Sequence, residues 1–275
     1  MTHLFLHWNK LKDEIRNKFL FLFLDYDGTL TPIIRNPDDA ILPKKTKEIL
    51  RELSKNPYCK LTIISGRALK DMKNIIGLED IIYVGNHGLE IEGPRLKFKS
   101  PVSLQYKIIL KKIKDVLTKK LSNVKGAFIE DKGLSLTLHY RLVDKKCTYL
   151  VKTIFHETII HYLVANRINI KLGKKVLEVI PPLEWNKGKA VLWLLARLKF
   201  ILGREVFMPM YIGDDITDED AFKVLKNRGL GIFIGEPTKT SSAKYYLRNS
   251  QEVSMFLKQV LEIKINIGKE GFGET

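Results

Sequence analysis

The chain of 275 residues has few of the features that mark secreted and membrane proteins. Its two cysteines, Cys59 and Cys147, lie far apart and belong to no Cys-x-x-Cys pair or metal-like cluster, which makes a reducing cytoplasm the default. No apolar run approaches the ~20 residues that a membrane-spanning helix needs. The N-terminus has neither a basic segment nor a small-residue cleavage site, so no signal peptide is indicated. We therefore expect a cytoplasmic protein.

Acidic residues are scarce as well, since 31 Asp and Glu residues stand against 47 Lys and Arg, a net charge of +16. An excess of this size invites a nucleic-acid interpretation. However, the basic residues are spread along the whole chain, and there is neither zinc-finger spacing nor an RNA-binding aromatic signature. A positive field would equally attract a small phosphorylated substrate. We expect no nucleic-acid partner and no membrane partner.

The order of apolar and amphipathic segments predicts a parallel α/β core. After a leading helix within 1–18, strands and helices alternate as in βαβ units, in strand 20–25, helix 43–54, strand 60–64, helix 68–76 and strand 81–85. The alternation resumes towards the C-terminus, in helix 187–200, strand 207–213, helix 218–227, strand 230–234 and helices to about 264. The tail, 268–275, is expected to be disordered.

Residues 101–180 follow a different order, with two strands after each of two helices. The expected segments are helix 101–121, strands 125–130 and 134–141, helix 145–165, and strands 168–172 and 175–180. Strict alternation in 134–141 predicts a half-buried antiparallel strand. The expected fold class is therefore α/β, with a Rossmann-like parallel-sheet core (1–100 and 181–275) and an inserted α+β domain of αββαββ order (101–180).

The most informative segment runs from Phe21 to Leu30, where an apolar strand ends in two acids, Asp25 and Asp27, followed by Gly-Thr. Ligands of open α/β folds bind at such strand ends. Two adjacent acids need a cation or a proton to relieve their repulsion, and a hard cation such as Mg²⁺ fits. The segment therefore indicates Mg²⁺-dependent phosphoryl transfer with a carboxylate nucleophile. The alternative is a strand that ends in an Asp-Gly turn.

Two other segments could hold a phosphoryl group. A second apolar strand ends in Ser65-Gly66-Arg67, where the hydroxyl and the following backbone N–H groups could bind phosphate oxygens. The alternative role of Ser65 is to cap the next helix. Lys187 opens a helix directly after the insert and could place its charge beside a transferring phosphoryl group or the nucleophile. The alternative for Lys187 is an ordinary solvated lysine.

A third apolar strand ends in Asp214 and Asp215, which could complete a metal site with Asp25. Helix capping explains the residues after them, because Thr217 and Asp220 have the spacing of a capping box. It does not explain two adjacent acids at the strand end.

These four segments, in this order, resemble the haloacid dehalogenase-type phosphohydrolase superfamily. The resemblance implies that Asp25 is the nucleophile, Asp27 the general acid and base, and that Ser65 and Lys187 hold the phosphoryl group. It implies a Mg²⁺ site made by Asp25, the backbone carbonyl of Asp27 and Asp214, with support from Asp215 and Asp218. The insert resembles the superfamily's α+β cap, which closes over the site and selects the leaving group.

Further strings resemble the trehalose-6-phosphate phosphatase family over about residues 19–262, among them Tyr83-Val84-Gly85-Asn86-His87-Gly88 and Glu130-Asp131-Lys132-Gly133. The resemblance implies a sugar pocket formed by Asn86, His87 and Gly88, together with Lys132, His139, Arg141 and Glu178 of the insert. Ser135, Thr137, His139 and Arg141 alternate onto one polar face that could grip sugar hydroxyls, unless that face is simply solvated. Gly66 and Arg67 would contribute to substrate binding.

The expected reaction is Mg²⁺-dependent hydrolysis of a small phosphosugar, trehalose 6-phosphate, by a monomer. Two alternatives stay open at this point. The substrate could be another phosphosugar, such as sucrose phosphate or mannosylglycerate phosphate, or the chain could be a catalytically silent phosphosugar-binding regulator. A silent domain would have no need for Asp25, Asp27, Ser65, Lys187 and Asp214 together.

Overall fold

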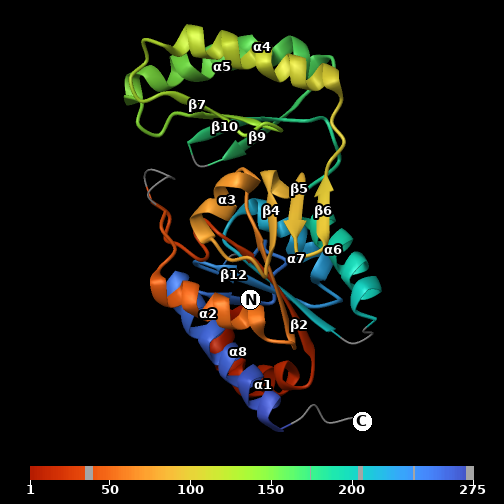
Figure 1. Ribbon diagram of the computed structural model, residues 1–275. Helices are drawn as coiled ribbons and strands as arrows, with labels where there is room; N and C mark the ends of the chain where they lie inside the picture. Colours follow the sequence, from red (N-terminus) through yellow and green to blue (C-terminus); the bar gives the residue numbers. More distant parts are fainter. Residues whose placement is uncertain (35–39, 174, 204–206, 238, 271–275) are drawn as a thin grey trace. The chain divides into compact units, whose positions relative to one another are not determined.

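The computed structural model describes residues 1–34, 40–173, 175–203, 207–237 and 239–270 (Figure 1). The chain divides into two compact units, which we call the core unit (Met1–Phe98 with Trp185–Thr275) and the inserted unit (Lys99–Glu184). Each unit has its own sheet and its own hydrophobic core. Within the described residues, no helix combines the length and the apolar composition needed to cross a membrane.

The core unit is built on a nine-stranded sheet in the order β1-β13-β12-β11-β2-β3-β4-β5-β6. The strands from β1 to β4 in this order pair in parallel, and β5 is antiparallel to β4. The strands are β1 (Thr2–His3), β2 (Phe19–Asp25), β3 (Cys59–Ile64), β4 (Ile82–Gly85), β5 (Glu90–Gly93), β6 (Leu96–Lys99), β11 (Phe207–Gly213), β12 (Leu230–Ile234) and β13 (Tyr245–Leu247). The predicted, mostly parallel α/β sheet is confirmed.

Strand β2 illustrates why this sheet is covered on both faces. All of its residues are buried, and its side chains alternate between two hydrophobic clusters. The leucines of β2 pack with α1 (Trp8–Arg16), α2 (Lys44–Lys55), α3 (Leu69–Ile76) and α8 (Ser250–Glu270). Its phenylalanines pack with α6 (Lys187–Leu202) and α7 (Glu219–Leu225). The sequence run Phe-Leu-Phe-Leu-Phe-Leu thus fills two different layers of the core unit.

The inserted unit contains an antiparallel four-stranded sheet in the order β7-β8-β10-β9, covered by two helices. The elements are α4 (Leu104–Leu121), β7 (Phe128–Asp131), β8 (Leu136–His139), α5 (Thr148–Val164), β9 (Asn169–Gly173) and β10 (Val176–Ile180). Apolar residues of the sheet, including Leu136, Leu138 and Val179, pack against Leu117 and Phe155 of the helices. The αββαββ order is as predicted.

Several short elements were not predicted. They are strands β1, β5, β6 and β13 and the 3-10 turns η1 (Leu4–His7), η3 (Asn86–Gly88), η4 (Lys145–Cys147) and η5 (Ile216–Asp218). The expected disorder of 268–275 is wrong for 268–270, because α8 continues to Glu270. Residues 271–275 lie outside the described residues, as does Lys174 in the expected turn between β9 and β10.

The expected exposure of one face of β8 is also wrong, because all four of its residues are buried. Strand β8 lies inside the sheet, between β7 and β10. His139 stacks on Phe128 with ring centroids 4.2 Å apart. Thr137 is in register with Glu130 on one side and with Glu178 on the other.

Candidate active site

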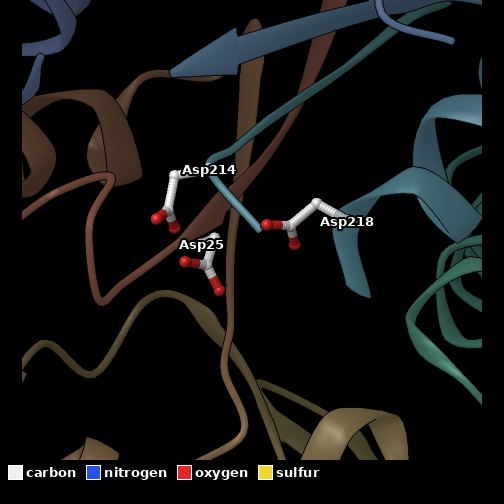
Figure 2. Close-up of side chains that lie close together, drawn as sticks. All are labelled: Asp25, Asp214 and Asp218. Carbon is white, nitrogen blue, oxygen red and sulfur yellow. The ribbon is translucent and has the colours of Figure 1, made fainter. Parts of the chain in front are cut away.

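Three carboxylates meet at the carboxyl edge of the main sheet (Figure 2), and the ammonium group of Lys187 contacts two of them. Asp25 is the last residue of β2, and Asp214 follows β11, the neighbouring parallel strand. Lys187 is the first residue of α6, and Asp218 ends η5. Parallel neighbours finish at the same edge, so residues far apart in sequence become adjacent. The predicted proximity of Asp25, Lys187 and Asp214 is thereby seen in the structure.

The Lys187 ammonium bridges two of these carboxylates. Its Nζ donates to Asp25 Oδ1 at 2.7 Å and to Asp218 Oδ1 at 2.6 Å. Burial would lower the pKa of Lys187, but the charges of Asp218 and Asp25 outweigh burial and raise it. Burial raises the pKa of Asp25 well above its usual value; Lys187 opposes this rise, and Asp218 and Asp214 add to it. Asp25 is therefore a carboxylate whose charge depends on its neighbours.

One ammonium group does not balance three carboxylates. Asp25, Asp214 and Asp218 each offer an oxygen within 4.8 Å of the others. With Lys187 the group carries two excess negative charges when all three acids are ionised, which a divalent cation would neutralise. A donor set made only of oxygens fits Mg²⁺. The residues present therefore fit the metal that the sequence suggested.

Gly28 is required by the geometry of this group. Its φ of +89° lies in the region that favours glycine, and a Cβ at this position would overlap the Asp214 carboxylate. The Gly-Thr pair after Asp27 is thus more than a turn signal, because Asp214 can approach the β2 edge only where a side chain is missing.

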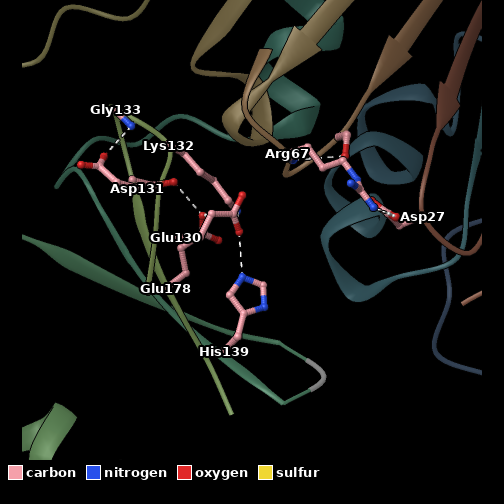
Figure 3. A network of polar contacts seen from close by, with 10 residues as sticks. Asp27, Arg67, Glu130, Asp131, Lys132, Gly133, His139 and Glu178 are labelled. Atoms are coloured by element: carbon pink, nitrogen blue, oxygen red, sulfur yellow. Dashed lines mark hydrogen bonds and ion pairs between the residues drawn. The ribbon is translucent and has the colours of Figure 1, made fainter. Parts of the chain in front are cut away.

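Asp27 lies beside Arg67 and not among the three carboxylates (Figure 3). Arg67 Nε donates to Asp27 Oδ2 at 2.7 Å, and a terminal guanidinium nitrogen donates to Oδ1 at 2.6 Å. The Asp27 side chain is 44% exposed, so it remains accessible to small molecules. The guanidinium also lies 5.4 Å from the centre of the Tyr26 ring. This two-pronged contact fixes the plane of the Asp27 carboxylate.

Two loops after neighbouring strands are joined by backbone hydrogen bonds. The Ser65 hydroxyl accepts from the N–H of Arg67 at 3.2 Å, which agrees with the capping alternative for this residue. The N–H of His87 donates to Ser65 O at 3.0 Å, and that of Asn86 donates to Arg67 O at 2.8 Å. Trp185 Nε1 donates to Gly88 O at 2.6 Å. The residues expected to hold phosphate and sugar in the core unit therefore lie side by side.

The inserted unit carries a second polar cluster (Figure 3). Glu178 is buried, and its Oε1 accepts from Lys132 Nζ at 3.1 Å and from Ser135 Oγ at 2.7 Å. His139 Nε2 and Glu130 Oε2 are 2.7 Å apart. Burial would raise the pKa of Glu130, but the hydrogen bond with His139 and the charge of Lys132 outweigh burial and lower it. Arg141 is exposed and lies in the turn after β8.

A sequence model of one protein family, described as trehalose-phosphatase, matches residues 23–251. Trehalose-phosphate phosphatase B of Arabidopsis thaliana is 32% identical over 270 residues, which cover 94% of this chain and 70% of the relative. The chain belongs to the trehalose-phosphatase family. The resemblance inferred from the motifs is confirmed, and family membership makes the chain a phosphoric monoester hydrolase.

Solved structures agree on the fold. The C-terminal domain of trehalose-6-phosphate phosphatase from Candida albicans superposes with a TM-score of 0.76 at 24% identity, covering 93% of this chain and 97% of that one. A haloacid dehalogenase-like hydrolase from Bacteroides thetaiotaomicron superposes with a TM-score of 0.60 at 16% identity, covering 88% of this chain and 100% of that one. Because both identities are below 25%, the two structures are evidence for the fold alone, and the second shows that this fold is haloacid dehalogenase-like.

The candidate site also contains residues that the motifs did not single out. Tyr211 is fully buried in β11, and its hydroxyl donates to Asp218 Oδ1 at 2.6 Å. Glu130 was noted only as part of a string. Both residues lie in strands beside apolar residues, where a sequence pattern predicts packing. Their polar contacts are therefore seen only in the folded structure.

The cap of η5 differs from the expected one. The capping box is formed by Asp215 and Asp218, not by Thr217 and Asp220. Asp215 Oδ1 accepts from the N–H of Ile216 at 2.6 Å, and Asp218 Oδ2 accepts from the N–H of Asp215 at 2.9 Å. The Asp215 side chain thus caps the start of η5, and it is not one of the three carboxylates that lie together.

Proposed function

We propose that the chain hydrolyses trehalose 6-phosphate to trehalose and phosphate through an aspartyl-phosphate on Asp25. The observation that carries this proposal is the buried contact of 2.7 Å between Asp25 and Lys187, beside Asp214 and Asp218. A carboxylate can attack phosphorus only when it is ionised and held in line. Lys187 favours the ionised form of Asp25, and it is itself held in place by Asp218.

Asp25, Asp214 and the backbone carbonyl of Asp27 would hold Mg²⁺, with Asp218 and Asp215 in support. When bound, the cation supplies stabilisation of the negative charge on the phosphoryl oxygens. Lys187 and Ser65 would contact the same oxygens from the protein side. Every one of these groups comes from a strand end or a helix start of the core unit.

Asp27 would protonate the oxygen of the leaving sugar and then take a proton from the attacking water. Its exposure and its two contacts with Arg67 support this role, because an acid must be reachable and correctly oriented. Arg67 would act as the residue that orients Asp27, in addition to its proposed part in substrate binding with Gly66.

We propose that residues of the core unit and residues of the inserted unit contribute to sugar binding. Asn86, His87 and Gly88 form η3 of the core unit. The inserted unit would contribute the polar residues Lys132, His139, Arg141 and Glu178, and would act as the cap. We place the functional boundary of the cap at residues 101–180, with 1–100 and 181–275 as the catalytic core of a monomeric enzyme.

The test is phosphate release from trehalose 6-phosphate, glucose 6-phosphate, sucrose 6-phosphate and mannose 6-phosphate, each with Mg²⁺ and with EDTA. We expect Mg²⁺-dependent release from trehalose 6-phosphate. Asp25→Asn should abolish turnover while the protein stays folded, whereas the exposed matched variant Asp13→Asn on α1 should retain it. Release from another sugar would keep the chemistry and reject the substrate. The absence of release from every sugar would favour a silent regulator.

A further inference from the structure

The face of the inserted sheet that does not pack against α4 and α5 carries a row of polar side chains. In the strand register, Thr137 of β8 lies opposite Glu130 of β7 and opposite Glu178 of β10. Residues directly opposite each other in antiparallel strands point to the same face, with Cβ atoms about 5 Å apart. The Thr137 side chain therefore lies between two glutamate side chains on this face of the sheet.

Thr137 differs from its neighbours in its hydrogen bonding. The Glu178 carboxylate accepts from Ser135 and Lys132, and Glu130 contacts His139. Thr137 is only 2% exposed, and within the part of the chain that the structure describes its Oγ1 has no hydrogen-bond partner. A buried hydroxyl without a partner is unfavourable, and valine would fill the same volume without that cost. A polar group of a ligand would supply the missing partner.

The surroundings define the chemistry of that partner. Two carboxylates flanking the hydroxyl would repel a phosphate group but accept hydrogen bonds from O–H donors. On the same face, Phe128 is 45% exposed and stacks on His139 with an interplanar angle of 4°, which provides an apolar ring beside the polar row. Hydroxyl groups around an apolar C–H face are the chemistry of a neutral sugar ring.

We propose that Thr137 is a specificity-determining residue whose hydroxyl hydrogen-bonds the sugar part of the substrate, away from the phosphate. This inference rests on the proposed function, because it names one more contact to the leaving sugar. It predicts that the hydroxyl contributes to recognition of the sugar and not to cleavage of the phosphate ester.

The variant that tests it is Thr137→Val, which keeps the volume and removes the hydroxyl. Thr62→Val is the matched control, because Thr62 is also fully buried with an unpartnered Oγ1, but lies in β3 of the core unit. Both variants should unfold at the same temperature as the parent protein or higher. Only Thr137→Val should raise KM for trehalose 6-phosphate, on the order of tenfold, which corresponds to about 1.4 kcal/mol.

Turnover of p-nitrophenyl phosphate, which lacks a sugar, should be unchanged in Thr137→Val, and Thr137→Ser should restore KM because it restores the hydroxyl. An unchanged KM in Thr137→Val would overturn the inference, as would an equal rise in Thr62→Val.

If the parent protein releases no phosphate from trehalose 6-phosphate, the proposed function fails by itself. Calorimetric titration with free trehalose, glucose and sucrose then decides on Thr137. Sugar binding that weakens in Thr137→Val supports the inference, and no binding or unaltered binding refutes it.

Discussion

Replacing Lys187 by methionine tests the charge arrangement at the centre of the site. The substitution keeps a long apolar stem and removes the ammonium group that contacts Asp25 at 2.7 Å and Asp218 at 2.6 Å. Removing one partner of a buried ion pair costs about 3–5 kcal/mol, because a charge is left buried and unpaired. Here two carboxylates lose the same partner, so without metal we expect a loss near the upper end of that range.

The loss of stability in Lys187→Met should depend on pH. The pKa of Asp25 is already raised in the folded protein, and removal of Lys187 would raise it further. A carboxyl whose folded pKa lies above its unfolded value of about 3.9 stabilises the fold fully only below that value and loses this contribution as pH rises through the folded pKa. Lys187→Met should therefore approach the parent protein in stability at acidic pH and differ most above neutrality.

The measurement is urea unfolding in EDTA at pH 5 and pH 8, for the parent, Lys187→Met, Asp25→Asn and the double variant. Because Asp25→Asn removes one of the stranded charges, the double variant should be more stable than Lys187→Met at pH 8. Phosphate release with Mg²⁺ should fall about 10²–10³-fold in Lys187→Met, the usual cost of losing one such donor. Equal stability of Lys187→Met and parent at pH 8, or strictly additive effects of the two substitutions, would refute the reasoning.

Two other predictions concern contacts of different kinds. Arg67→Lys cannot keep both hydrogen bonds to Asp27, so phosphate release should fall on the order of tenfold. The free energy of unfolding, measured by thermal unfolding, should change by no more than about 1 kcal/mol, because the pair is partly exposed. Full activity of Arg67→Lys would contradict the orienting role. Lys264 is buried and donates to Ile15 O and Lys18 O, both at 2.6 Å, and burial lowers its pKa to about 8. Since this pKa lies below the unfolded value, stability should rise between about pH 8 and pH 10.5, by up to about 3 kcal/mol at 1.36 kcal/mol per pH unit. Urea unfolding at pH 7.5 and pH 10 should show a smaller rise in Lys264→Met, and parallel slopes for the two proteins would count against this explanation.

The position of the candidate site at one edge of the sheet could be predicted from sequence because it depends on strand ends. An apolar run followed by acids, as at Asp25 and at Asp214, encodes both the strand and the position of the carboxylate. Once the strands are parallel neighbours, their ends meet. Lys187 follows from the same logic at a helix start. These residues needed no side-chain geometry to be assigned to one place.

The remaining features depend on tertiary contacts. Strands β1 and β13 are two and three residues long, and they form because β13 pairs with β12 and β1 pairs with β13. The apolar pattern of β11 hides the hydrogen bond between Tyr211 and Asp218. In the same way, alternation in β8 indicated a polar face, but it did not reveal that Thr137 is buried, in register with Glu130 on β7 and Glu178 on β10. The hydrophobic period and the composition of a segment carry no information on which side chains lie beside it on neighbouring strands.

The loop of η3 shows how the proposed sugar residues depend on the proposed acid. Asn86 and His87 have φ values of 49° and 57°, a region that costs residues other than glycine about 1–2 kcal/mol each. Both N–H groups are bonded to the loop that carries Ser65 and Arg67. A side chain on Gly66 would overlap the His87 ring, so that position must stay bare. The strain is thus offset by contacts with the loop that holds Asp27 through Arg67, and a change in either loop must displace the other.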